Sequence, residues 1–178
     1  MESTSTVNIE IFQFFNSLFG SSVTFDLIVI FLAEYYIHFL FLGALLFIYK
    51  DYGVDSKPLF RLHLLALILI LSLVSALAYA TRVFYPYPRP FLLYDITHIA
   101  TSSLYSFPSA HTIVIFGLAV GVYVYNKRFA YFLGVSGLLV GISRVVAGVH
   151  YPLDILGGAA LGVCVGFIVD WIFRKRRP

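Results

Sequence analysis

The sequence predicts an all-α integral membrane helical bundle, and three observations support that fold class. Of the 178 residues, 60% are hydrophobic and only 12% are charged, about half the charged fraction of an ordinary soluble domain. The apolar residues form runs near twenty residues long, the length at which a helix crosses a bilayer. Most charged residues lie between these runs. We expect one domain over residues 1–178, with about five transmembrane helices and a short N-terminal interfacial helix.

The N-terminal segment, residues 1–22, is expected to lie at the membrane interface. Phe12, Phe15 and Phe19 recur in it at helical spacing, as in a short helix that lies among the lipid headgroups. The alternative is an uninterrupted extension of the first membrane helix. No basic segment precedes the first apolar run, which argues against a cleaved signal peptide.

Five apolar runs are predicted to span the membrane: residues 27–49, 62–81, 109–125, 129–148 and 152–173. The first contains Glu34 and His38, which share a helical face because they are four residues apart. An ionisable side chain at that depth marks a candidate functional site. We therefore expect Glu34 to contact a substrate headgroup or to brace an arginine. A carboxyl group that is simply paired inside the bundle is the alternative.

Residues 83–107 are expected to form a structured loop. Pro86, Pro88 and Pro90 rule out one continuous helix here. A connection of this length in a compact domain is usually either functional or disordered. Its many aromatic residues argue against disorder, so a functional loop is the prediction.

The basic residues predict the orientation, because Lys and Arg are enriched on the cytoplasmic side of membrane proteins. Five spans place the loop at 50–61, the turn at 127–128 and the C-terminus on one side, which then holds nine of the twelve Lys and Arg residues. We expect a multi-pass protein of the cytoplasmic membrane, with a cytoplasmic C-terminus and an extracytoplasmic loop at 83–107. The other three basic residues, on the disfavoured side, are Arg82, Arg89 and Arg144. Binding of a phosphate explains their position, and contact with lipid headgroups is the alternative.

Three short motifs lie at span ends on that outer side. The motifs are Arg82 with Arg89-Pro90, then Pro108-Ser109-Ala110-His111, and finally Ser143-Arg144 followed by His150 and Asp154. A helix that begins at the second motif presents free backbone N–H groups, which bind anions. Each motif alone is weak, since a single membrane histidine is more often a packing residue. Their order and shared side make the combination specific.

The residue types in these motifs fit phosphoryl transfer. Asp154 can turn back to one ring nitrogen of His150 and fix its tautomer, which leaves the other nitrogen free to attack phosphorus. His111 would protonate the leaving oxygen, and the three arginines would clamp the phosphate oxygens. Ser109, with the N–H groups at Ala110 and beyond, completes the cradle. No carboxylate cluster offers a Mg²⁺ site, so neither a metal nor another cofactor is expected.

The motifs resemble those of the type 2 phosphatidic acid phosphatase (PAP2) superfamily, which are Lys-x6-Arg-Pro, Pro-Ser-Gly-His and Ser-Arg-x5-His-x3-Asp. Within it, the short five-span chain and the stretches at 33–35 and 106–109 are similar to undecaprenyl-diphosphate phosphatases, which recycle the polyprenyl carrier of cell-wall synthesis. The resemblance implies that His150 is the nucleophile, Asp154 its partner and His111 the acid, with the arginines and Ser109 binding phosphate.

Two positions depart from the family pattern. Arg82 stands where the family usually has Lys, which keeps the charge on a wider, forked donor. Ala110 stands where the family often has Gly. A helix start with negative φ accepts Ala, whereas a position with positive φ would not. Both departures leave the chemistry possible.

These inferences predict a lipid phosphatase that converts undecaprenyl diphosphate, or another polyprenyl diphosphate, to the monophosphate through a phosphohistidine. Phosphatidylglycerophosphate or phosphatidate is the alternative substrate, and a non-catalytic lipid carrier transporter is the alternative of another class. A vanadate-dependent peroxidase shares similar motifs, but the five hydrophobic spans argue against it. The expected partners are the lipid substrate and the bilayer, and a net charge of +3 gives no indication of nucleic-acid binding. The single cysteine, Cys164, excludes an intrachain disulfide, and the oligomeric state stays open.

Overall fold

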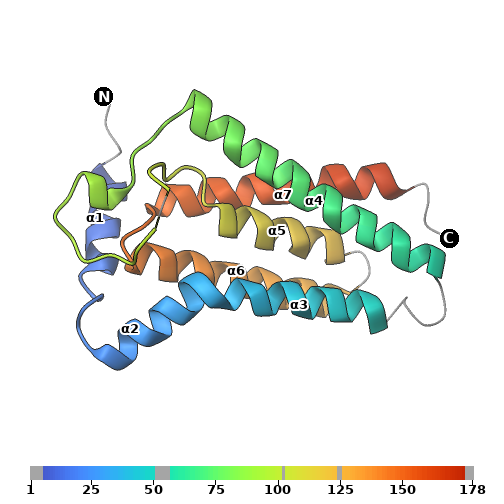
Figure 1. Cartoon of the computed structure of the whole chain (residues 1–178), viewed down its shortest axis with the longest axis horizontal. Coiled ribbons are helices and arrows are strands. Elements are labelled where there is room, and N and C mark those ends of the chain that lie inside the picture. The colour runs from blue at the N-terminus through green and yellow to red at the C-terminus, as the bar shows by residue number, and fades with distance from the viewer. Residues whose placement is uncertain (1–5, 51–56, 102, 124–125, 175–178) are drawn as a thin grey trace.

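The structure is a computed structural model that describes residues 6–50, 57–101, 103–123 and 126–174. Within these ranges the regular secondary structure is helical, as predicted. Most of the long helices run lengthwise along the bundle, some of them visibly inclined, whereas the first helix of the chain runs across it (Figure 1). In chain order they are α1 (Thr6–Asn16), α2 (Val23–Ile30), the π-helical turn η1 (Phe31–Tyr35), α3 (Tyr36–Ile48), α4 (Lys57–Phe84), the 3₁₀ turn η3 (Pro90–Leu92), α5 (Ala110–Tyr123), α6 (Lys127–Val146) and α7 (Pro152–Arg174).

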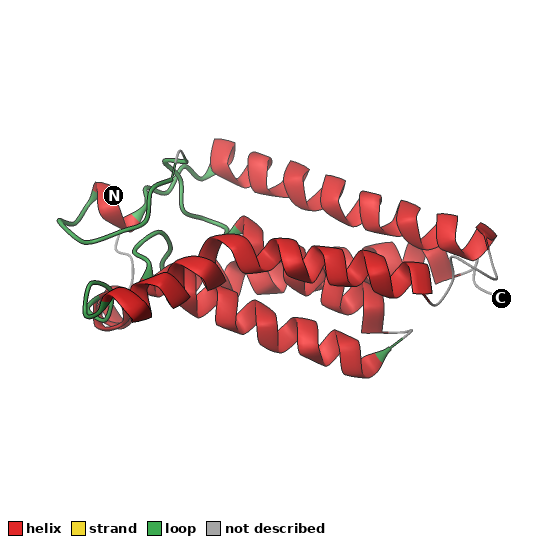
Figure 2. Cartoon of the chain, turned by 60° about the horizontal axis from the view of Figure 1, so that its bottom comes forward, coloured by secondary structure: helices red, strands yellow, loops and turns green. Residues whose placement is uncertain are grey.

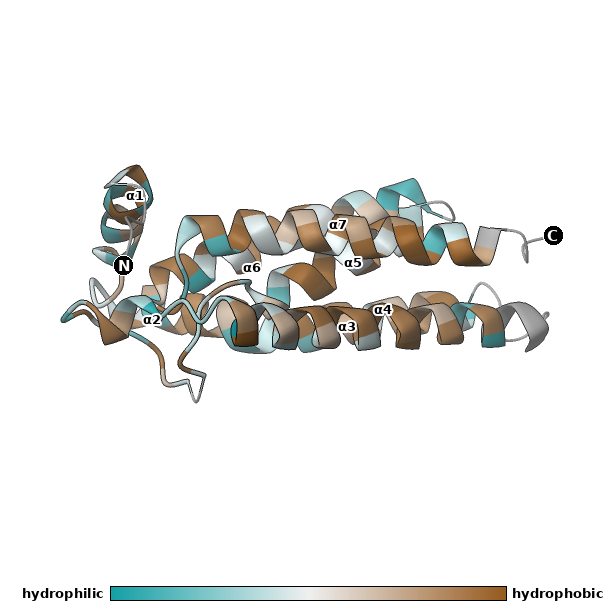
Figure 3. Ribbon diagram, turned by 90° about the horizontal axis from the view of Figure 1, so that it is seen from above, coloured by the Kyte–Doolittle hydropathy of each residue, from teal (hydrophilic) through white to brown (hydrophobic). Residues whose placement is uncertain are grey.

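Four helical segments of the described chain are long and apolar enough to cross a membrane, and they are Val23–Ile48, Arg61–Phe84, Lys127–Val146 and Pro152–Phe173. Their outward faces carry large apolar side chains such as Phe39, which is 60% exposed, and Trp171, which is 72% exposed. Figure 3 shows that hydrophobic residues recur along the whole length of these helices. Such a surface needs lipid rather than water around it.

The predicted third span is shorter than expected. The described helix α5 has 14 residues, from Ala110 to Tyr123, and residues 124–125 of the predicted span lie outside the described ranges. It lies inside the bundle against α6, α7, α4 and α3, and Ile113 and Ile115 are fully buried. A core helix exposes little surface to lipid, so its apolar residues cover all of its faces instead of one.

Glycine brings α5 and α7 into backbone contact. A Cβ added to Gly162 would stand 3.0 Å from the backbone nitrogen of Gly117. Small residues at such crossings let membrane helices approach closely.

The helix ends separate into two groups. The end of α4, the start of α7 and the long loop between α4 and α5 lie at one end of the bundle, and α1 lies there too (Figure 1). Figure 2 shows that most of the loop backbone gathers at one end of the bundle. The start of α4, the start of α6 and the end of α7 lie at the other end. Helix α4 continues to Phe84, so Arg82 lies in its last turn and the loop starts slightly later than predicted.

Helix α1 does not extend the first membrane helix. Residues 17–22 separate it from α2, and Gly20 adopts a left-handed conformation (φ 87°) in this turn. The Ser22 hydroxyl caps α2 by accepting a hydrogen bond from the Phe25 N–H (3.2 Å). Figures 1 and 3 show α1 running across the direction of the other helices, so the alternative of a continuous helix is wrong.

Candidate active site

The three motifs meet in one polar pocket of about 330 Å³ at the N-terminal end of α5. Its walls come from η1, the end of α4, the α4–α5 loop, the start of α5, the end of α6 and the α6–α7 turn. Segments more than a hundred residues apart in sequence therefore share one cavity. Its lining residues are Glu34, Arg82, Arg89, Ala100, Thr101, Ala110, His111, Arg144 and His150.

His150 lies in the tight turn between α6 and α7. Gly148 has a φ of 75° and reverses the chain, and Pro152 then starts α7 at a position that suits proline. The turn buries His150 to 1% exposure. Its side chain still reaches the pocket, so a single turn supplies one wall of the cavity.

Asp154 stands behind His150 in the first turn of α7. Its Oδ2 lies 3.4 Å from His150 Nδ1 and accepts a shorter hydrogen bond, of 2.7 Å, from the Tyr151 N–H. The backbone bond fixes the carboxylate, and the contact with the imidazole is at the long end of hydrogen bonding. Because Nδ1 faces Asp154, Nε2 is the ring nitrogen left for the pocket.

The surroundings of His150 favour its neutral form. Burial lowers the pKa of His150 well below its ordinary value, and the positive charges of Arg144 and Arg89 lower it further. A neutral imidazole keeps a lone pair on one nitrogen, which is what a nucleophile requires.

Arg89 is held by the backbone. Its Nε donates to the Tyr105 carbonyl (3.3 Å) and its Nη1 to the Val149 carbonyl (3.1 Å). Burial, together with Arg144 and Arg82, lowers the pKa of Arg89 to about 10, so the guanidinium stays charged at neutral pH. Arg89 thus links the α4–α5 loop to the residue before His150.

Arg144 is held by the π-helical turn. Its Nη1 donates to the Ala33 carbonyl (2.8 Å) and to Glu34 Oε1 (3.0 Å). Single π turns inside α-helices occur frequently at functional sites, and here the turn contributes both acceptors. Of the two expectations for Glu34, the structure therefore places it against an arginine.

Two arginine nitrogens in this region lack a partner among the described residues. Arg82 Nε and Arg144 Nε are buried and make no hydrogen bond there. Buried polar groups are nearly always hydrogen-bonded, so donors of this kind in a pocket with three guanidinium groups suit an anion.

The second motif places its residues differently. Ala110 starts α5 and lines the pocket with His111, and it has no positive φ, which is why Ala is accepted there. Ser109 is fully buried behind the wall. Its N–H donates to the Asp154 carbonyl (3.2 Å) and its hydroxyl accepts from Thr112 (3.0 Å), so direct contact between Ser109 and a substrate stays a prediction.

Ala100 and Thr101 also lie in the pocket wall, although neither could be predicted as a site residue. No pattern in the chain marks them, because the path of the loop depends on contacts with α1 and α6.

Among residues 6–50, 57–101, 103–123 and 126–174, no three His, Cys, Asp or Glu residues are grouped as metal ligands would be.

The PAP2 superfamily model matches residues 62–178, about two thirds of the chain. The chain belongs to the PAP2 superfamily. The family assignment covers all three motifs and agrees with the site geometry, so this is a membrane phosphatase of PAP2 type. The matched region begins after α1, α2 and α3. Glu34, which lines the pocket, therefore lies outside the matched region.

Two bacterial proteins and one solved structure are similar to this PAP2 protein over most of their length. It is 32% identical to the bacitracin transport permease protein BcrC of Bacillus licheniformis, over 97% of this chain and 84% of that protein. It is also 32% identical to the undecaprenyl-diphosphatase BcrC of Bacillus subtilis, over 97% and 87%. The crystal structure of Aquifex aeolicus LpxE has a TM-score of 0.75 at 26% identity, covering 93% of this chain and 96% of that one.

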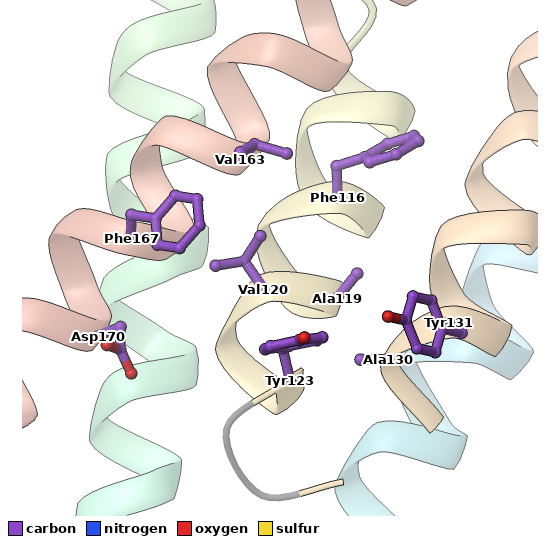
Figure 4. A pocket seen from close by; sticks show the side chains of 9 residues that line it. All are labelled: Phe116, Ala119, Val120, Tyr123, Ala130, Tyr131, Val163, Phe167 and Asp170. Carbon is purple, nitrogen blue, oxygen red and sulfur yellow. The ribbon is translucent and has the colours of Figure 1, made fainter. Parts of the chain in front are cut away.

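The PAP2 protein has a second pocket, of about 220 Å³, at the C-terminal end of α5 (Figure 4). Apolar and aromatic side chains of α5, α6 and α7 line it, and Asp170 lies at its edge. It has neither the arginines nor the histidines of the first pocket. The remaining lining residues are Phe116, Ala119, Val120, Tyr123, Ala130, Tyr131, Val163 and Phe167.

Proposed function

We propose that this protein removes the terminal phosphate of undecaprenyl diphosphate, or of a closely related polyprenyl diphosphate, through a phosphohistidine on His150. The observation that carries the proposal is the convergence of three arginines on a neutral histidine that is backed by a carboxylate. The substrate follows from the B. subtilis relative, which is named for this activity. Recycling of the carrier lipid for cell-wall synthesis follows from the same substrate.

The first chemical step forms a bond between His150 Nε2 and the terminal phosphorus. The bond from that phosphorus to the bridging oxygen breaks, and His111 gives its proton to the departing undecaprenyl monophosphate. Arg82, Arg89 and Arg144 stabilise the charge on the equatorial oxygens, which is the largest contribution in most phosphoryl transfers.

In the second step water attacks the phosphohistidine. His111 takes a proton from the water, the bond between phosphorus and nitrogen breaks, and inorganic phosphate leaves. Asp154 holds the imidazole in one tautomer through both steps. The reaction needs no metal ion, since the three guanidinium groups supply the positive charge.

The site would lie on the outer face of the cytoplasmic membrane. Nine of the twelve basic residues belong to the opposite end of the bundle or to the chain segments next to it, and that end is then cytoplasmic. A lipid whose tail stays in the bilayer can present its headgroup to a pocket at the membrane surface.

The B. licheniformis relative carries a transport name, which favours a second candidate, a lipid carrier transporter without chemistry. The two candidates differ at His150. A transporter keeps its function when His150 is replaced by Ala, whereas loss of a nucleophile costs several orders of magnitude in turnover.

The test measures inorganic phosphate released by the purified protein in detergent with EDTA. Undecaprenyl diphosphate, phosphatidylglycerophosphate and phosphatidate are compared for the wild type, His150→Ala and a control, His38→Ala, whose exposed ring lies outside the pocket lining. We expect the highest kcat/KM with the diphosphate, its loss in His150→Ala and its retention in the control. A requirement for added Mg²⁺, or a preference for a glycerophospholipid, would overturn the assignment.

A further inference from the structure

Helix α1 reaches the active-site segments through one of its faces. Asn8, Phe12 and Asn16 are spaced four residues apart, so they share a helical face. All three are buried in a helix whose other residues are mostly exposed. Two buried amides on a short surface helix need buried partners, and those partners lie beside the catalytic turn.

Asn16 joins two of the segments that form the pocket. Its Nδ2 donates to the Thr97 carbonyl (3.0 Å) and to the Val146 carbonyl (2.9 Å). Thr97 precedes Ala100 and Thr101 of the pocket wall, and Val146 ends α6 two residues after Arg144. Both hydrogens of the amide are therefore used, and each holds a different segment.

The junction around Asn16 is tightly packed. A Cβ on Gly148 would stand 2.8 Å from the Thr97 carbonyl oxygen and 3.0 Å from Asn16 Nδ2. The Ile99 N–H also donates to the Ala147 carbonyl (3.1 Å). The loop, the end of α6 and the amide of Asn16 thus meet two residues before His150.

Asn8 and Phe12 act on the other side of the same turn. Asn8 Oδ1 accepts a hydrogen bond from the Leu153 N–H (3.0 Å), one of the free donors of the first turn of α7. The fully buried ring of Phe12 packs against Tyr151 with a centroid distance of 5.3 Å. Leu153 is the neighbour of Asp154, so α1 contacts the turn both before His150 and after it.

We propose that α1 is a clamp on the catalytic turn and that Asn16 is its main positioning residue. The clamp fixes the His150 turn relative to the pocket wall, and it lies outside residues 62–178, which the PAP2 model matches. The proposal rests on the role of His150 in the proposed function. Misplacing a reacting group by about 1 Å costs on the order of 100-fold in rate, so loosening the clamp reduces kcat.

The test compares the same change, from amide to carboxylate, at three positions of α1. Asn16→Asp removes both donors and sets a carboxylate against two carbonyl oxygens. Asn8→Asp keeps an oxygen acceptor for Leu153, and a negative charge is favourable at a helix N-terminus. Gln13→Glu, on the exposed face, is the matched control.

The assay uses undecaprenyl diphosphate and, as a probe without a lipid tail, p-nitrophenyl phosphate. We expect Asn16→Asp to lower kcat about 10- to 100-fold with both substrates and to change KM less than about threefold. We expect Asn8→Asp to lower kcat less than Asn16→Asp does, and Gln13→Glu to stay within about threefold of the wild type. Hydrogen exchange of residues 97–101 and 146–150 should accelerate in Asn16→Asp alone. If Asn16→Asp does not fold, Asn16→Ala, which removes the donors without adding charge, takes its place.

A wild-type kcat in Asn16→Asp, or an equal loss in Gln13→Glu, would overturn the clamp. A loss of activity that is proportional to the loss of folded protein would also overturn the clamp. In that case Asn16 has a purely structural role, which lowers the yield and leaves the kcat of each folded molecule unchanged. The proposed function fails separately, when the wild type hydrolyses neither substrate or when His150→Ala remains active. In that case the exchange measurement alone decides whether α1 holds the turn.

Discussion

The pockets at the two ends of α5 share helices but differ in the backbone around them. The polar pocket borders the π turn η1, the α4–α5 loop and the α6–α7 turn, whereas regular turns of α5, α6 and α7 form most of the apolar one. In a regular helix each carbonyl already accepts a bond from the chain. Irregular backbone leaves carbonyls free, and Arg144 and Arg89 use those of Ala33, Tyr105 and Val149.

This difference explains how a membrane protein keeps two buried guanidinium groups, those of Arg89 and Arg144, beside the partly buried one of Arg82. Charged side chains inside a membrane are expensive and need partners, and the polar end offers carbonyl oxygens and Glu34. Substitutions at the two ends should therefore have very different consequences.

After the loss of His150 itself, replacing Arg144 by Lys is expected to lower kcat/KM the most. One ammonium cannot bind the Ala33 carbonyl and Glu34 and still present a flat donor edge to phosphate. We expect kcat/KM to fall by about 100-fold or more, as on removal of a donor that stabilises transition-state charge. Arg128→Lys, at the exposed start of α6, is the matched control, and equal losses in both variants would contradict the account.

The pH dependence tests the electrostatics around His150. Its neutral form is the reactive one, and burial with the nearby arginines lowers its pKa, so that form persists to more acidic pH. The pH dependence of kcat/KM reports the pKa values of the free enzyme. We expect kcat/KM not to decrease as the pH is lowered through 6.5, the ordinary pKa of histidine. The measurement is kcat/KM from pH 5 to 8. If protonation of His150 made kcat/KM fall with a midpoint at or above pH 6.5, the pKa of His150 would not be lowered.

Glu34→Gln should have a moderate effect. The amide oxygen still accepts a bond from Arg144, but the opposite charge is lost, and the Glu34 side chain is 36% exposed. Half-exposed ion pairs contribute about 1 kcal/mol or less. We expect kcat/KM to fall roughly two- to fivefold, since about 1 kcal/mol or less corresponds to a factor of about five at most; unchanged turnover would remove Glu34 from the site.

Asp170→Asn, at the apolar end, should change least. The residue lies at the edge of the second pocket, at the opposite end of α5 from His150. We expect a kcat/KM within about twofold of the wild type, because effects at distant sites without shared partners are small and independent. A tenfold loss would mean that the two ends are coupled.

Much of the fold could be predicted from the sequence, because span length and apolar composition depend on local sequence alone. The motifs located His111, His150 and the arginines, which the structure brings to one pocket. The wall residues Ala100 and Thr101 could not be found, since small loop residues carry no pattern. The roles of Asn8 and Asn16 were also invisible, because their partners lie more than eighty residues away.

A covalent phosphate on His150 is the defining intermediate of the proposed mechanism, and it can be trapped during turnover. The enzyme is mixed with undecaprenyl diphosphate labelled in its terminal phosphate, quenched under alkaline conditions and digested. We expect transient label, one phosphate per active site at most, on the peptide that contains His150, and none in His150→Ala. Full turnover without label on this peptide, or label on another residue, would contradict it.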